Sequence, residues 1–155
     1  MKFDIDINAV NESLKDIEAN SNSGENDVPV GKYDVKIDKI ELKSTQKGMP
    51  MGFIQFRIQS GEHKKKCLFY NQVLVGTDKN TGQPTAYGIH NFNKFLKSLD
   101  SRLDIKFVDF NQYENLLLDI AEAVYPLIYE IQYSRKKDFP VYEILGVFED
   151  ESIPF

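Results

Sequence analysis

The spacing of apolar residues between positions 33 and 42 most constrains how this chain can fold. Tyr33, Val35 and Ile37 alternate with polar residues, which is typical of a half-buried β-strand. The apolar positions then move to Ile40 and Leu42, so the alternation slips by one residue. A slip of this kind inside a strand predicts a β-bulge near Asp38-Lys39. Strongly bent, bulged first strands are typical of small closed barrels.

The rest of the pattern predicts four more strands and two helices. Strands are expected at residues 51–58, 67–75, 127–134 and 139–148, where apolar and polar residues alternate between turn-rich segments. Helical spacing of apolar residues predicts helices at 89–99 and 111–123, and Pro126 prevents the second from continuing. Three strands, a helical insert and two strands form the layout of the OB-fold. We therefore predict a mainly β fold, a five-stranded OB-fold-like barrel with a helical insert between strands 3 and 4.

Charge divides the 155-residue chain into three parts. Residues 1–27 carry a net charge of −5 and end in a Gly/Ser/Asn-rich linker, residues 28–146 carry +3, and residues 147–155 carry −3. We therefore expect a flexible acidic N-terminal segment at 1–27, one folded domain at 28–148, and a flexible acidic tail at 149–155. The mildly basic body makes nucleic acid a plausible ligand class despite a total net charge of −5.

The composition favours a cytoplasmic protein without cofactors. The sequence has no apolar run long enough to cross a membrane and no signal-peptide pattern. A single cysteine, Cys67, forms no intramolecular disulfide and suits a reducing compartment. Zinc-ligand spacing and phosphate-binding glycine motifs are both absent from the sequence, so we expect no cofactor and no catalytic residue.

Two parts of the chain resemble families of single-stranded DNA-binding proteins. The acidic stretch ending in Ile153-Pro154-Phe155 resembles the tail of the bacterial members. Short motifs of the body resemble a related phage family: Gly31-Lys32-Tyr33, Lys47-Gly48, Ile58-Gln59-Ser60-Gly61, Phe69-Tyr70-Asn71 and the helix from Asn91 to Leu96. The resemblance implies an OB-fold protein, encoded by a bacteriophage and acting in the host cytoplasm, that binds single-stranded DNA during DNA replication, recombination or repair.

In the bacterial proteins the tail docks partner enzymes. Here the resemblance assigns that role to Glu149, Asp150, Glu151, Ile153, Pro154 and Phe155. The chemistry suits it, since Phe155 offers an apolar anchor and Pro154 restricts the backbone, which reduces the entropy lost on docking. The three acids can steer the tail toward a basic surface. We expect the partners to be replication or recombination proteins.

Binding of single strands without sequence preference needs cations along the phosphates and aromatic faces for the bases. The chain has no Trp, so stacking must use Phe or Tyr. On the second strand, Phe53 and Arg57 are expected to share an outward face. A core position for Phe53 is the alternative. The full set of candidates is Phe53, Arg57, Lys64, Lys65, Lys66, Tyr70, Arg135, Lys136, Lys137 and Lys47.

Two other functions stay open at this point. Asp38 with Glu41-Leu42-Lys43 resembles the carboxylate pair and Lys of metal-dependent nucleases. A protein-interaction module with an OB-like fold is the second alternative. The prediction is nevertheless a non-catalytic DNA-binding protein with weak base preference. The choice between DNA and RNA, the oligomeric state, including a homo-oligomer, and the identity of the tail's partner are left open by the sequence.

Overall fold

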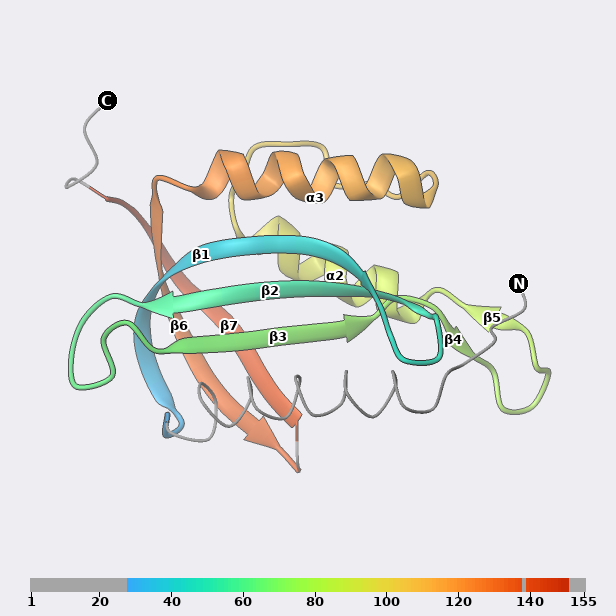
Figure 1. Cartoon of the computed structure of the whole chain (residues 1–155), viewed down its shortest axis with the longest axis horizontal. Helices are drawn as coiled ribbons and strands as arrows, with labels where there is room; N and C mark the ends of the chain where they lie inside the picture. Colours follow the sequence, from blue (N-terminus) through green and yellow to red (C-terminus); the bar gives the residue numbers. More distant parts are fainter. Residues whose placement is uncertain (1–27, 138, 151–155) are drawn as a thin grey trace.

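The computed structural model describes residues 28–137 and 139–150, and its centre is a five-stranded antiparallel sheet. The strand order is β3-β2-β1-β6-β7. The bounds are β1 Gly31–Ser44, β2 Pro50–Ile58, β3 Cys67–Val73, β6 Leu127–Lys136 and β7 Phe139–Glu149. Figure 1 shows β6 and β7 crossing β2 and β3 at a steep angle, so the sheet is strongly curled. The mainly β class is therefore confirmed.

The strand β1 carries the curl of the sheet, because it has a different neighbour along each half. Its first half, Gly31 to Val35, pairs with β6, and the part from Val35 to Ser44 pairs with β2. Between these halves the register with β2 shifts at Ile37/Lys39. The extra residue is Asp38, so the β-bulge expected from the alternation is confirmed.

The sheet does not close into a barrel, which corrects the expected closed form. In the described chain β3 and β7 are the two edges of the sheet, and no strand pairing joins them. They are joined instead by side chains, since the Tyr142 hydroxyl donates to the Phe69 carbonyl at 2.9 Å. The rings of Tyr70 and Tyr142 also stack with centroids 5.9 Å apart. The two edges contact each other at this point. We call the unpaired boundary between β3 and β7 the seam.

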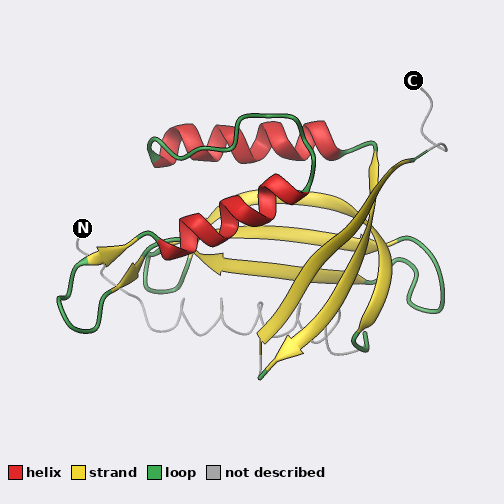
Figure 2. Cartoon of the chain, turned by 180° about the vertical axis from the view of Figure 1, so that it is seen from behind, coloured by secondary structure: helices red, strands yellow, loops and turns green. Residues whose placement is uncertain are grey.

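Between β3 and β6 lie a small hairpin and two helices. The hairpin pairs β4 (Gly76–Thr77) with β5 (Pro84–Thr85), and the helices are α2 (Tyr87–Ser98) and α3 (Phe110–Val124). Both helices match the predicted ranges to within two residues. Figure 1 shows α3 running along β1, and α2, seen in front of the sheet in Figure 2, contacts β3. None of the helices in the described residues combines the length and the apolar character that crossing a membrane requires.

The starts of the two helices are stabilised in different ways. Asp109 caps α3, because its side chain accepts from the Gln112 amide at 2.7 Å. The helix α2 has no side-chain cap, but the Ile89 amide donates to the Leu74 carbonyl at 3.1 Å. One of the first amides of α2 is thus satisfied by the chain that leaves β3. This bond holds α2 against the edge of the sheet.

The core lies between the inner face of the sheet and the two helices. Ile54, Phe56 and Ile58 are buried, as expected for the inner face of β2. Tyr129 and Tyr133 are also buried in this core. The Tyr129 hydroxyl donates to the Leu99 carbonyl at 2.6 Å, so this buried polar group is satisfied at the end of α2.

The expected boundary between body and tail at residue 149 is too early. Glu149 pairs with Leu127 as the last residue of β7. Asp150 is buried, its amide donates to the Pro126 carbonyl at 2.8 Å, and its carboxylate lies 2.7 Å from the Lys36 ammonium. Glu149 belongs to the folded body because β7 extends one residue beyond its predicted end, and Asp150 belongs to it through its contacts with Pro126 and Lys36. Residues 151–155, like 1–27, lie outside the described part of the chain.

Candidate nucleic-acid interface

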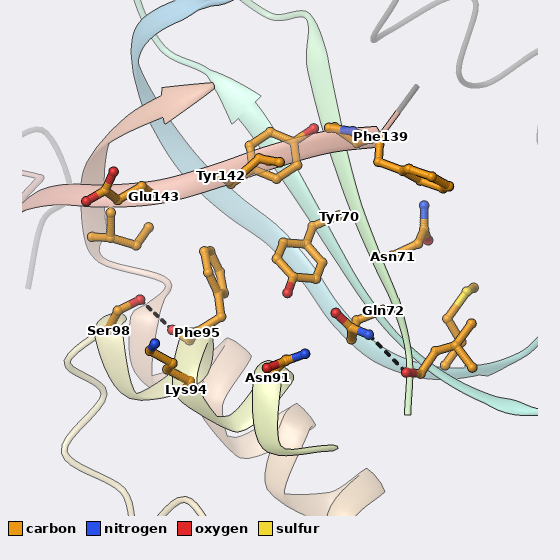
Figure 3. A pocket seen from close by; sticks show the side chains of 15 residues that line it. Tyr70, Asn71, Gln72, Asn91, Lys94, Phe95, Ser98, Phe139, Tyr142 and Glu143 are labelled. Atoms are coloured by element: carbon orange, nitrogen blue, oxygen red, sulfur yellow. Dashed lines mark hydrogen bonds between the residues drawn. The ribbon is translucent and has the colours of Figure 1, made fainter. Parts of the chain in front are cut away.

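A groove of about 980 Å³ follows the seam between β3 and β7. One wall is the edge of β3, the other is the first half of β7, and α2 lies between them (Figure 3). This groove is the result of the open sheet, because two hydrogen-bonded edges would leave no space there. Its residues are Met51, Tyr70, Asn71, Gln72, Val73, Asn91, Lys94, Phe95, Ser98, Phe139, Pro140, Val141, Tyr142, Glu143 and Ile144.

Aromatic rings form the deep part of the groove. Tyr70 packs on Phe95 with centroids 4.9 Å apart and stacks on Tyr142. Burial raises the pKa of Tyr70, so its hydroxyl keeps its proton at neutral pH. Phe139 differs from these three, because 71% of its surface is exposed at the start of β7. The groove thus combines a buried aromatic floor with one aromatic ring open to solvent.

Four polar side chains that line the groove have no partner among the residues that the structure describes. Asn71 comes from β3, Asn91 and Lys94 come from α2, and Glu143 comes from β7. Within residues 28–137 and 139–150, these side chains make no hydrogen bond or ion pair. Two other polar residues are already engaged: Gln72 donates to the Val73 carbonyl at 3.0 Å, and Ser98 donates to the Phe95 carbonyl at 2.5 Å. The four free groups are available to a ligand.

Phe53 lies on the outer face of β2 as predicted, but it is buried rather than open to solvent. Only 8% of its surface is exposed. Its ring stacks on Phe69 with centroids 5.9 Å apart, and the Lys43 ammonium lies 3.8 Å from the ring centroid. A base could not stack on this ring without displacing its neighbours. The expected exposed platform at Phe53 is therefore corrected.

Arg57 shares the outer face of β2 with Phe53 and is bound to the bulge. Its Nε lies 2.7 Å from the Asp38 carboxylate, and its Nη1 donates to the Lys65 carbonyl at 2.9 Å. The hydrogen bond that Arg57 donates to the Asp38 carboxylate raises the pKa of Arg57. Gln55 also donates to Asp38, at 3.3 Å. Arg57 thus ties the bulge to the loop between β2 and β3.

The carboxylates of the nuclease alternative do not lie together as free metal ligands. Asp38 is engaged by Arg57 and Gln55, and Glu41 lies 3.9 Å from the Lys43 ammonium. Among the residues that the structure describes, no group of three or more His, Cys, Asp or Glu side chains could hold a metal ion.

The predicted cations lie at three separate places. Lys64 and Lys65 are exposed and Lys66 is half-buried in the loop after β2, whereas exposed Lys47 lies in the loop before β2. These two loops are at opposite ends of that strand. The third cluster, Arg135, Lys136 and Lys137, is exposed at the turn between β6 and β7. Because β7 begins at Phe139, this cluster adjoins the groove.

The sequence leaves the face of Tyr70 open, because Tyr70 faces outward only if Phe69 lies in the core, and the structure places Tyr70 on the inner face. Phe69 takes the outer face, where it meets Phe53. Tyr70 nevertheless remains a candidate, because it packs against the core and lines the groove at the same time.

The comparison with protein families bears on most of the folded chain. Residues 15–124 match the model described as Protein of unknown function (DUF669). The chain belongs to this family. No curated protein matches the sequence of this chain. The segment matched to DUF669 contains β1, β2, β3, α2 and α3, whereas β6 and β7 lie beyond it. Two walls of the groove therefore belong to the DUF669 segment, and the third, β7, does not.

Sequence reasoning missed most of the groove in this DUF669 protein. Tyr70 is the one lining residue of the groove that the sequence predicted as a binding residue, whereas Phe95, Phe139, Tyr142, Asn71, Lys94 and Glu143 were not among the predicted binding residues. A local signal existed for Phe139, because an aromatic residue follows directly after a basic turn. The other residues converge only because β3 and β7 face each other across the seam, and no local spacing encodes that approach.

Proposed function

We propose that this protein is a non-catalytic single-stranded DNA-binding protein that holds bases in the groove between β3 and β7. The observation that carries the proposal is the solvent-exposed ring of Phe139 at the rim of an aromatic-lined groove. Base stacking on an aromatic ring contributes about 1–3 kcal/mol per base and tolerates any sequence. The exposed cations Arg135, Lys136 and Lys137 adjoin this rim and can contact phosphates.

The strand order supports the proposal at the level of the fold. Along the chain, three strands are followed by helices and then by β6 and β7, and in the sheet the order is β3-β2-β1-β6-β7. This arrangement corresponds to an OB-fold that is open between its third and fifth strands. OB-folds commonly bind oligonucleotides on strands 2 and 3 and on the loops between strands 1–2 and 4–5. Lys47 lies in the first of these loops, and the cluster at 135–137 occupies the end of β6 and the start of the second.

The test is fluorescence anisotropy with a labelled mixed-sequence single strand at low and high salt, with duplex DNA as competitor. We expect binding that weakens with salt and that duplex does not displace. Phe139→Ala should weaken binding by about 1–3 kcal/mol. Phe148→Ala is the matched control, because Phe148 is 53% exposed at the other end of β7 and lies outside the groove.

Two results would count against the proposal. Equal losses in the two Phe variants would mean that the groove is not the binding site. Absence of binding in the intact chain would favour the protein-interaction module, for which the exposed apolar rim of Val73, Phe139 and Val141 offers a contact surface.

Within this proposal, segment 151–155 recruits replication, recombination or repair proteins. A truncation that tests it should keep Asp150, because removing that residue also removes the ion pair with Lys36. We expect a chain shortened after Asp150 to keep its DNA affinity and to lose the partner. A loss of DNA affinity in the shortened chain would contradict this division of roles.

A further inference from the structure

The charges inside the groove indicate which part of a nucleic acid it holds. Of the groove's lining residues, two are charged, Lys94 and Glu143, so the lining is neutral overall. The exposed cations of the turn at 135–137 lie outside it. A carboxylate repels phosphates, and the aromatic floor favours flat rings. Given the proposed function, on which this inference rests, bases occupy the groove and phosphates follow the turn.

The carboxylate of Glu143 is the group that distinguishes one base from another. It is exposed on β7 and makes no hydrogen bond or ion pair within the described residues. An ionised carboxylate only accepts hydrogen bonds. Cytosine presents an exocyclic amino group that can donate to it. Uracil and thymine present a carbonyl oxygen at the same ring position, which the carboxylate repels, and the one donor on that edge, the N3–H, is flanked by two carbonyl oxygens that weaken its bond to a carboxylate.

The other free groups of the groove do not oppose this discrimination. The amides of Asn71 and Asn91 each carry a donor and an acceptor, so they can pair with either kind of base edge. The Lys94 ammonium donates, and all pyrimidines carry the O2 carbonyl that can accept from it. In Figure 3 Asn71 and Asn91 lie on either side of Tyr70, Lys94 lies on α2 next to Phe95, and Glu143 lies on β7 beyond Tyr142.

We propose that Glu143 makes the groove select bases with an exocyclic amino group, so that cytosine is bound in preference to uracil and thymine. Oligonucleotides of dC and dU test this directly, because the two bases differ at positions 3 and 4 of the ring and in nothing else. We expect dC to bind roughly two- to tenfold more tightly than dU, as one net hydrogen bond would give. Anisotropy titrations at one salt concentration measure the ratio.

The variant Glu143→Gln should bring the dC/dU ratio close to one, because the Gln amide can donate as well as accept. Removing the negative charge should strengthen binding of both oligonucleotides, and the ratio cancels that general effect. Glu114→Gln makes the same change on the exposed face of α3, away from the groove, and should keep the ratio of the unaltered protein. Equal thermal unfolding of the three proteins would confirm that they fold alike.

The outcomes separate this inference from the function on which it rests. Binding of dC and dU with equal affinity would overturn the role of Glu143 and leave single-strand binding intact. A dC preference that persists in Glu143→Gln would also overturn it. Failure of the intact chain to bind any single strand would reject the proposed function itself, and with it this inference.

Discussion

Gly88, in the first turn of α2, lies so close to β3 that a methyl group has no room. A Cβ there would lie 1.8 Å from the Val73 carbonyl oxygen and 2.8 Å from the Leu74 Cα. These are backbone atoms, so no side-chain rotation relieves the contact. We expect Gly88→Ala to lower the free energy of unfolding by roughly 1–3 kcal/mol, measured by urea denaturation.

The matched control for that substitution is Gly76→Ala. Its Cβ would meet only the Thr85 hydroxyl, at 3.3 Å, in the small hairpin. We expect a clearly smaller effect there, and equal effects of the two substitutions would show that contact with β3 is not what excludes a side chain at Gly88.

At the scale of elements, the contact between β3 and β7 depends on Tyr142. Removing its hydroxyl in Tyr142→Phe deletes the bond to the Phe69 carbonyl but leaves the ring against Tyr70. We expect a loss of about 0.5–1.5 kcal/mol in unfolding free energy. We also expect faster amide exchange at Asn71 on the unpaired edge of β3, because the seam opens more readily.

Tyr87→Phe serves as the control, since 76% of Tyr87 is exposed and it lies outside the groove. Tyr87→Phe should change neither the free energy of unfolding nor the rate of amide exchange at Asn71. Unchanged exchange in Tyr142→Phe would mean that the seam is held by the stacked rings alone.

The elements themselves were largely predictable from sequence, whereas their approach to one another was not. The strands, the helices and the bulge follow from local alternation and spacing, as at Ile37 and Ile40. The face of Tyr70 could not be predicted because Phe69 and Tyr70 are both aromatic, so the alternation in β3 does not show which of them faces the core. Closure of the barrel was wrong because it depends on the distance between two edges that are far apart in the chain, where Phe69 and Tyr142 are separated by 73 residues.

For the whole molecule, the buried tyrosines predict how stability changes at high pH. Burial raises the pKa of Tyr113 and Tyr129 above the ordinary value of 10.0, so the folded state keeps protons that the unfolded state loses. Their contribution to stability is fully present below pH 10.0 and falls as the pH rises above it. We expect a urea midpoint that falls steeply above about pH 10.

The tyrosinate absorbance of the folded protein should lag behind that of the protein in denaturant over the same range. Tyr129→Phe should flatten the decline in the midpoint, because it removes one of the titrating groups. A midpoint that stays constant as both tyrosines ionise would contradict the raised pKa values.

The bulge in β1 has a consequence for how this fold can vary among relatives. Asp38 is the extra residue, and Ile37 and Ile40 face the core on either side of it. A bulge depends on the number of residues in the strand, so another amino acid at position 38 would preserve it. Such a substitution would remove the ion pair with Arg57. Deleting the residue would keep the same side chains inward in a regular strand and would remove the local bend. The curvature that separates β3 from β7 is thus encoded by chain length, and one lost codon could alter the shape of the groove without changing a single residue that lines it.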